Sequence, residues 1–337
     1  MDAKTAAQKE IPSLWEAAKQ ESEGYGFLGN YEQPKWEIPE AIGISCAVSS
    51  RFDENSDHGH SVSSVEQYID EASAVIEEGA FSIHIDFTWV TDKSGRRLDE
   101  MPQAEAYPMV LEPLRKRYGY SFMADLNVLN GKTFDECMGP VYAGLAEVAP
   151  CAPGHPEAFV GPAVRTLYAH GVLPALAIHN SGEIELTKRR LIDTGIMQGP
   201  VLWGLLFGLP FDIGRTLLSG NTVMDADDMV RQMMLMIHQI RKIDPNAQIL
   251  CCAAGRATMY MTTLATMLGL HIRVGTEDTP YKYPNSDERF TNNLEMFKAA
   301  KEIAALHGRR PATANEMRAL DRKSTRLNSS HTDISRM

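Results

Sequence analysis

The sequence contains no long uninterrupted apolar run and no recognisable targeting segment. None of its apolar stretches reaches the roughly 18 to 20 residues that a membrane-spanning helix needs. The first ten residues, MDAKTAAQKE, lack the basic segment followed by an apolar segment that marks a secretory signal. We therefore expect a cytoplasmic protein with no membrane partner.

Cysteine is scarce, with five residues in a chain of 337. The number is odd and no pair has C-x-x-C spacing, which argues against both a disulfide framework and a structural zinc site. We expect thiols that are reduced and mostly buried. They are Cys46, Cys137, Cys151, Cys251 and Cys252.

The sequence also lacks any dense cluster of basic residues, and its formal net charge is -11 at pH 7. Binding to nucleic acid needs clustered Lys and Arg that neutralise phosphates, so we expect no nucleic-acid partner. No G-x-G-x-x-G follows the first predicted strand, and no G-x-x-x-x-G-K-[ST] occurs anywhere in the chain. Neither dinucleotide binding nor a P-loop is therefore supported.

The chain does contain 44% hydrophobic and 23% charged residues, which is typical of a soluble globular protein with a sizeable core. Short apolar runs alternate with amphipathic stretches of helical length, the pattern of a parallel sheet with helical crossovers. Eight such units predict one (β/α)8 TIM barrel, whose site must lie at the carboxyl ends of the strands. The predicted strands are 41–48, 81–87, 121–128, 145–151, 173–179, 201–207, 248–253 and 271–275, and the predicted helices include 65–78, 108–118, 162–170, 184–194, 226–243 and 258–268.

The barrel is predicted to occupy residues 41–321, and the two ends of the chain read differently. Residues 1–40 are polar with scattered aromatics, and we interpret them as an N-terminal arm. Residues 322–337 have no apolar periodicity and an abrupt change of composition, so we interpret them as a non-native tail.

A cation and two adjacent carboxylates stand at the end of the eighth predicted strand, in His271-Ile-Arg-Val-Gly-Thr-Glu-Asp278. Alternate residues of a strand face one side, so Arg273 and Glu277 are expected to share a face while Asp278 begins the following loop. This is the pattern of a catalytic strand end. The same residues also fit an ordinary arginine beside two solvated acids.

Polar residues at the end of the second predicted strand suggest a metal site. In Ile83-His84-Ile85-Asp86 the two polar side chains point to the same face of the strand. With Glu277 from the neighbouring eighth strand they would supply three protein ligands and leave positions for water and substrate. The alternative is that His84 is a hydrogen-bonded core histidine and Asp86 a helix cap.

Beyond these residues, the sequence resembles the β-keto acid cleavage enzymes from about residue 41 to 320. The resemblance rests on Gly95-Arg96 after the second strand, on Gly255-Arg256 after the seventh, and above all on the octapeptide 271–278. It continues through a helix that ends at 304–309 and through the stretch 310–314.

The resemblance implies a TIM barrel that binds a divalent metal, usually zinc, and uses acetyl-CoA to split a β-keto acid into acetoacetate and a new CoA thioester. It places His84 and Glu277 on the metal, and Arg273 and Asp278 near the reacting keto acid. The second histidine of the family's His-x-His pair is here Asp86, which leaves iron and manganese open beside zinc. A tetramer is also implied.

Three departures from the family pattern concern the substrate. Arg51 follows the first strand, where the family commonly has an acid that binds an amino group, so an anionic or neutral substrate end is favoured. The loop Asn127-Val-Leu-Asn130-Gly131 replaces a Ser-Thr-Gly-Gly signature, and Arg51 and Asn130 are the predicted substrate-binding residues. His179 ends the fifth strand in place of the family's acids, either as a catalytic base, as a further metal ligand or as a residue that shapes the pocket.

Three functions are therefore open. The first is a metal-dependent carbon–carbon lyase or acyltransferase that acts on a small carboxylate, with acetyl-CoA as co-substrate and Arg273, Asp278 and His179 as catalytic residues. The second is a β-elimination lyase or hydrolase that needs the metal but no CoA. The third is a degenerate barrel without catalysis.

Overall fold

The computed structural model describes residues 15–16, 19, 35–49, 62–208 and 226–320. The chain divides into two compact units, Met1–Ile38 and Pro39–Met337, and the barrel belongs to the second. Most of the first unit lies outside the described residues, as does the predicted tail 322–337. The arm, barrel and tail boundaries stay predictions.

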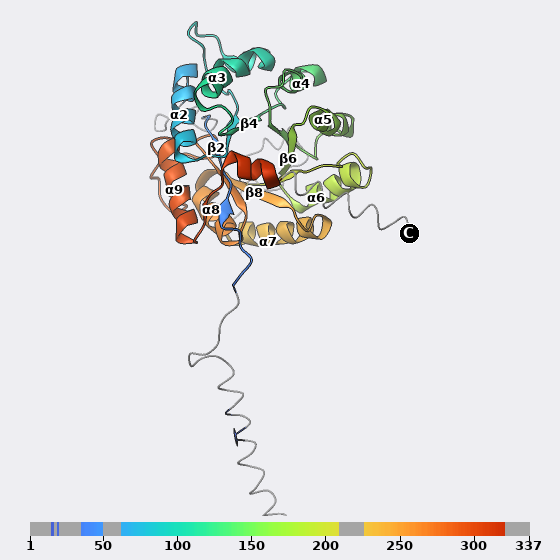
Figure 1. The fold of residues 1–337 in the computed structure, drawn as a ribbon, viewed down its shortest axis with the longest axis vertical. Coiled ribbons are helices and arrows are strands. Elements are labelled where there is room, and N and C mark those ends of the chain that lie inside the picture. The colour runs from blue at the N-terminus through green and yellow to red at the C-terminus, as the bar shows by residue number, and fades with distance from the viewer. Residues whose placement is uncertain (1–14, 17–18, 20–34, 50–61, 209–225, 321–337) are drawn as a thin grey trace, which may run out of the picture. The chain divides into compact units, whose positions relative to one another are not determined.

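Eight parallel strands close into a barrel in sequence order, β2-β3-β4-β5-β6-β7-β8-β9, which confirms the predicted TIM barrel (Figure 1). Closure joins the first strand of the ring to the last, with Ile44 opposite Ile272 and Cys46 opposite Val274. Each strand lies within a predicted range. The strands are β2 (Ile44–Ala47), β3 (Ser82–Ile85), β4 (Met123–Leu126), β5 (Val148–Cys151), β6 (Leu173–Ile178), β7 (Leu202–Phe207), β8 (Gln248–Ala253) and β9 (His271–Val274).

Helices surround the strands, as Figure 1 shows. Two of the predicted ranges, 65–78 and 226–243, are reproduced at both ends. The buried residues of α7 recur at helical spacing, so its methionines belong to the core. The helices are α2 (Val65–Glu78), α3 (Gln103–Tyr118), α4 (Phe134–Tyr142), α5 (Glu157–Ala169), α6 (Ser181–Thr187), α7 (Ala226–Ile243), α8 (Thr258–Met267) and α9 (Asn293–Leu306).

Some helix boundaries differ from the prediction for identifiable reasons. Helices α3 and α5 begin five residues before the predicted starts, because Pro102 and Pro156 immediately precede them and the later prolines lie inside the helices. Helix α4 was not predicted, since Gly139 and Pro140 are poor helix formers. The hydroxyl of Thr133 caps it by accepting a hydrogen bond from Glu136 N.

The amino-terminal end of the barrel is covered by the last described residues. The short strand β10 (Arg310–Pro311) pairs in parallel with β1 (Ala41–Ile42). Helical residues 314–320 follow and cross the barrel, in dark red at the centre of Figure 1. Met317 packs in one apolar cluster with Phe81 and Met123, which begin or precede their strands. Apolar side chains therefore close the interior of the barrel at this end and form its floor.

All five cysteines are free and buried, as predicted. Burial raises the pKa of Cys151 and of Cys251 to about 12, so these two thiols hold their protons at neutral pH. Among the residues described, no helix is long and apolar enough to cross a membrane.

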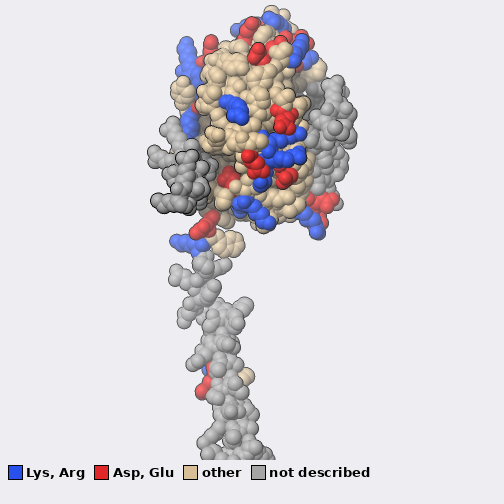
Figure 2. All heavy atoms as spheres, turned by 90° about the vertical axis from the view of Figure 1, so that its right-hand side faces the viewer, with Lys and Arg blue, Asp and Glu red and all other residues tan. Residues whose placement is uncertain are grey.

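Figure 2 shows the face that carries α5 and α6 at the right of Figure 1. Basic and acidic side chains are interspersed there over a largely uncharged surface. Ion pairs of α5 and of the segment that follows α6 include Lys188 with Asp193 at 2.7 Å and Arg190 with Glu157 at 3.9 Å. The described residues on this face form no continuous patch of one sign.

Gly275 lies against Ala47 at the barrel closure. Its φ is +153°, and a Cβ atom built on it would lie 2.0 Å from the carbonyl oxygen of Ala47. The backbone immediately after β9 therefore approaches the end of β2 more closely than a residue with a side chain permits. Glu277 N then donates to the same carbonyl oxygen at 3.3 Å.

We expect Gly275→Ala to cost at least about 3 kcal/mol of unfolding free energy, because the added methyl must displace backbone atoms. The control is Gly308→Ala, at a glycine with φ +69° and no atom within 4 Å of its built Cβ. It should lose only about 1 to 2 kcal/mol. Urea unfolding of both variants measures the difference, and equal losses would contradict the proposed contact.

Candidate active site

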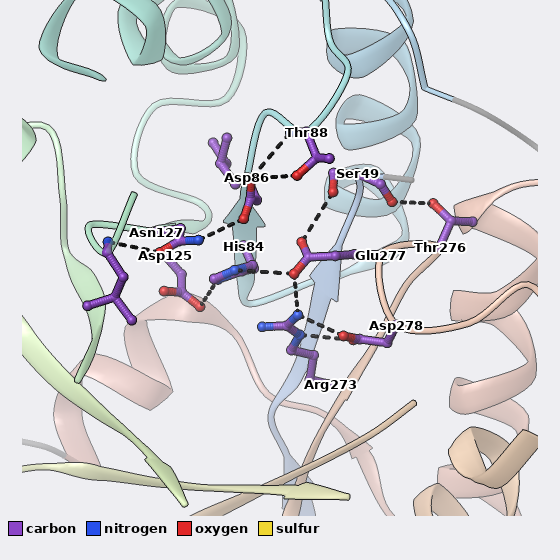
Figure 3. A network of polar contacts seen from close by, with 12 residues as sticks. Ser49, His84, Asp86, Thr88, Asp125, Asn127, Arg273, Thr276, Glu277 and Asp278 are labelled. Atoms are coloured by element: carbon purple, nitrogen blue, oxygen red, sulfur yellow. Dashed lines mark hydrogen bonds and ion pairs between the residues drawn. The ribbon is translucent and has the colours of Figure 1, made fainter. Parts of the chain in front are cut away.

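Buried polar side chains gather at the carboxyl ends of β3, β4 and β9 (Figure 3). Glu277 and Asp278 are only 4% and 1% exposed, so they are not the solvated acids of a loop mouth. Arg273 comes from β9 itself, and both carboxylates come from the turn that follows it. The charged side chains of the octapeptide 271–278 thus form a buried cluster at the carboxyl end of the barrel.

Arg273 links the two carboxylates of this turn. Its Nε and Nη2 donate to the two oxygens of Asp278 at 3.0 and 2.8 Å, and Nη2 also donates to Glu277 Oε1 at 2.8 Å. Burial opposes the charge of the guanidinium, but Asp278 and Glu277 outweigh it and hold the pKa of Arg273 well above its usual range. Burial raises the pKa of Glu277, an effect that Arg273 and His84 partly offset.

His84 lies between two carboxylates. Its Nδ1 is 2.9 Å from Asp125 Oδ2 and its Nε2 is 3.7 Å from Glu277 Oε1. A carboxylate only accepts, so Nδ1 carries a proton and Nε2 faces Glu277. Burial and Arg273 act to lower the pKa of His84, but Asp125 and Glu277 prevail and raise it.

Asp86 is held by different partners. Its Oδ2 accepts a hydrogen bond from Asn127 Nδ2 at 2.7 Å, and its Oδ1 accepts from the backbone and hydroxyl of Thr88 at 3.2 and 3.1 Å. Asp86 lies close enough for its charge to raise the pKa of Glu277. Within the described part of the chain, however, no three His, Cys, Asp or Glu side chains are arranged to hold a metal ion.

Two of the three predicted metal ligands nevertheless fit a cation. Zinc binds imidazole nitrogen and carboxylate oxygen at about 2.0 to 2.2 Å in a tetrahedral arrangement, so two of its ligand atoms lie about 3.3 to 3.6 Å apart. The distance of 3.7 Å between His84 Nε2 and Glu277 Oε1 is close to this range. For Asp86 to become a third ligand, one of its hydrogen bonds with Asn127 or Thr88 would have to be replaced by a bond to the ion.

Asn293, the first residue of α9, fixes the turn that carries Glu277. Its Oδ1 accepts from Thr276 N at 2.9 Å, and its Nδ2 donates to Val48 O, Thr276 Oγ1 and Glu71 Oε2 at 3.2, 2.9 and 3.2 Å. Asn293 is fully buried, so these bonds are made away from water. The helix thereby ties the turn to the end of β2.

A second polar group stands at the end of β6. His179 is 8% exposed, and its Nδ1 lies 3.1 Å from Glu183 Oε2 in the first turn of α6. Burial lowers the pKa of the neighbouring His155, an effect that Glu183 opposes and His179 reinforces. In the closed order of strands, β6 lies across the barrel from β2 and β9. His179 and Arg273 therefore belong to opposite sides of the barrel.

Of the two predicted substrate-binding residues, Arg51 lies outside the described residues. Asn130 is exposed in the loop after β4, and the asparagine that enters the cluster is Asn127.

The prediction also missed Asp125, Ser49 and Glu183. Asp125 alternates with Asn127 along β4, so the two-residue period of a strand could have found it. Ser49 Oγ donates to Glu277 Oε2 at 3.4 Å, a contact across the barrel closure with no local sequence signal. Glu183 stands in the first turn of α6, only four residues after His179, so it was close in the sequence to a residue already singled out.

The model of a known protein family, described as beta-keto acid cleavage enzyme, matches residues 121–320, more than half of the chain. The chain belongs to the beta-keto acid cleavage enzyme family. Membership confirms the resemblance seen in the sequence and implies an enzyme with activity of this type. The match includes Arg273, Glu277 and Asp278 and begins after His84 and Asp86.

Solved structures with a similar fold have low sequence identity to this member of the family. The apo structure of ObcA is 17% identical with a TM-score of 0.58; the match covers 77% of this chain and 65% of ObcA. Type I 3-dehydroquinate dehydratase from Clostridium difficile is 11% identical with a TM-score of 0.49, over 82% of this chain and 98% of that one. No curated protein matches the sequence. The likeness to ObcA supports the fold alone.

We expect Asp125→Asn to lower the pKa of His84, because the neutral amide no longer stabilises the imidazolium. In the wild type the pKa lies above its ordinary value of 6.5. The resulting stability is therefore fully present below pH 6.5 and is lost as the pH rises through the folded pKa. In the variant this pH-dependent part should shrink.

NMR titration of the histidine ring protons in metal-free protein measures the change. His271 serves as an internal reference, since burial lowers its pKa to about 4 and its ring nitrogens contact Gly43 and Gln248 instead. A pKa of His84 that stays in place or rises in the variant would refute the assigned pairing.

Proposed function

We propose that this protein is a metal-dependent lyase or acyltransferase of the β-keto acid cleavage type, acting on a small carboxylate with acetyl-CoA as co-substrate. The observation that carries the proposal is the buried group of Arg273, Glu277 and Asp278 beside His84 in a member of this family. Buried charges cost stability unless they are paired, and a cluster of this size is typical of a functional site.

Arg273 is suited to bind and polarise the substrate. Three of its hydrogen bonds go to Asp278 and Glu277, and all of them use Nε and Nη2. Nη1 makes no hydrogen bond to the residues that the structure describes, so it can donate to a substrate carboxylate or to an enolate oxygen. Asp278 is oriented by two of these bonds and is our candidate for taking and returning the proton.

His84 and Glu277 would hold the divalent ion, with Asp86 as the proposed third ligand. The harder, more anionic set keeps zinc, iron and manganese as candidates. When bound, the ion would act as a Lewis acid on the keto oxygen. Asp125 orients the imidazole through Nδ1, as carboxylates commonly do for histidines that bind metals.

His179 is the proposed second proton-transfer group. The Glu183 carboxylate beside Nδ1 fixes the orientation of the ring. Because His179 and Arg273 come from opposite sides of the barrel, a substrate held on Arg273 would reach His179 with its other end. Arg51 and Asn130 remain proposed contacts of the substrate, and a homotetramer remains the proposed assembly.

The His179 and Glu183 pair also favours a second candidate, a metal-dependent β-elimination lyase or hydrolase that uses no CoA. A carboxylate that orients an imidazole is a common arrangement for a general base. Product formation from a small carboxylate in the absence of CoA would favour this candidate over the first.

The proposal predicts that the purified protein converts some member of a β-keto acid panel with acetyl-CoA into acetoacetate and a new thioester. Arg273→Lys should lower kcat/KM by about 100-fold or more, because lysine cannot donate at the same positions. Arg117→Lys, at an exposed arginine on α3, is the matched control and should behave like the wild type. Acetoacetate and CoA thioester are followed by mass spectrometry. No turnover across acidic, neutral and cationic keto acids by metal-loaded protein would contradict the proposal.

Metal dependence is tested separately. Dialysis against a chelator should abolish turnover, and one of zinc, iron or manganese should restore it. Elemental analysis should then find about one ion per chain in the wild type and much less in Glu277→Gln, which loses an anionic ligand. Full activity of protein shown to be free of metal would rule the ion out.

A further inference from the structure

The interior of this barrel is lined by several small side chains among larger apolar ones. TIM barrels normally fill their interior with layers of bulky branched residues. Here the inward positions of β5, β6 and β7 include Pro150, Ala175, Ala177 and Gly204. Across the barrel, Ser45 and Ser82 are also small and hydrogen-bond to each other at 2.8 Å.

These small residues leave a cavity inside the barrel. Several residues of β6 and β7 that line it are partly accessible to solvent. Along β6, Leu173, Ala175 and Ala177 are partly accessible, whereas the residues between them are buried. Leu206 on β7 is likewise partly accessible between the buried Leu205 and Phe207. The cavity has a volume of about 80 Å³.

The two ends of the cavity differ in polarity. Met317 and Phe81 line its floor, where the helical residues 314–320 cover the barrel. His84, Asp125 and Arg273 line the end that belongs to the candidate active site. Asp125 Oδ1 is buried and has no hydrogen-bond partner in the described structure. An apolar chamber thus lies directly beneath the charged groups of the site.

We propose that this chamber is the subsite for the alkyl end of the substrate, so that the enzyme selects β-keto acids with a short unbranched aliphatic chain. The inference rests on the proposed function for the polar end of the substrate. The charged groups bind the keto acid, and the chain extends downward between Ala177 and Leu206. An apolar cavity of 150 Å³ takes up benzene, so one of about 80 Å³ suits about three carbons.

The test measures binding of 3-hydroxyalkanoates of four to eight carbons to metal-loaded protein by calorimetry. These analogues keep the carboxylate and an oxygen at the keto position, and acetyl-CoA is left out so that nothing turns over. Each added methylene should tighten binding about fourfold until the chamber is full, after which affinity should fall.

Two variants change the chamber in opposite directions. Ala177→Leu fills it and should abolish the gain with chain length, while Leu206→Ala enlarges it and should move the optimum to a longer chain. Ala305→Leu adds the same side chain at an exposed position on α9 and should bind as the wild type does. If Ala177→Leu does not fold, Ala177→Val is measured in its place and should weaken the longer analogues at least tenfold.

Affinity independent of chain length in the wild type, or a wild-type profile in the filled variant, would overturn the inference. The same holds if no analogue binds at all. These outcomes are distinct from failure of the proposed cleavage reaction. A protein that selects chain length but makes no thioester from acetyl-CoA would keep the subsite and lose the proposed function.

Discussion

The close approach of Gly275 to Ala47 is the contact on which the rest of the site depends. It closes the barrel between β9 and β2 at the level where the strands end. From there the chain turns at once, and the turn places Glu277 and Asp278 back against Arg273. A wider closure would move both carboxylates away from His84 on the next strand. Asn293 stabilises this geometry from the helix side by binding Thr276.

The charged side chains of the site pair with one another rather than with water. Arg273 pairs with Glu277 and Asp278, and His84 with Asp125, so these buried ions have opposite partners. Such clusters stabilise a fold weakly at best, because desolvation offsets most of the attraction. Their value lies in fixed geometry, since charges held in place need little reorganisation when a substrate or an ion arrives.

The sequence was sufficient to predict the barrel, because short apolar runs alternate along the chain with amphipathic stretches of helical length. It was also sufficient to select Arg273, Glu277 and Asp278, which are neighbours in the chain. It could not pair Asp86 with Asn127, since that contact depends on the register that sets His84 of β3 opposite Asp125 of β4. The chamber inside the barrel could not be predicted from the sequence either. Its small residues come from three strands, and they leave a cavity only when these strands lie side by side.

The order of strands has a consequence for biosynthesis. Ile44 and Ile272 are partners across the closure, separated by most of the barrel sequence. On the ribosome, β2 leaves one edge unpaired until β9 has been made, and such an edge is prone to pair with other chains. The floor of the barrel forms later still, with Met317. This protein must therefore protect an open sheet for most of its synthesis, and its need for chaperones should be set by its topology more than by its final stability.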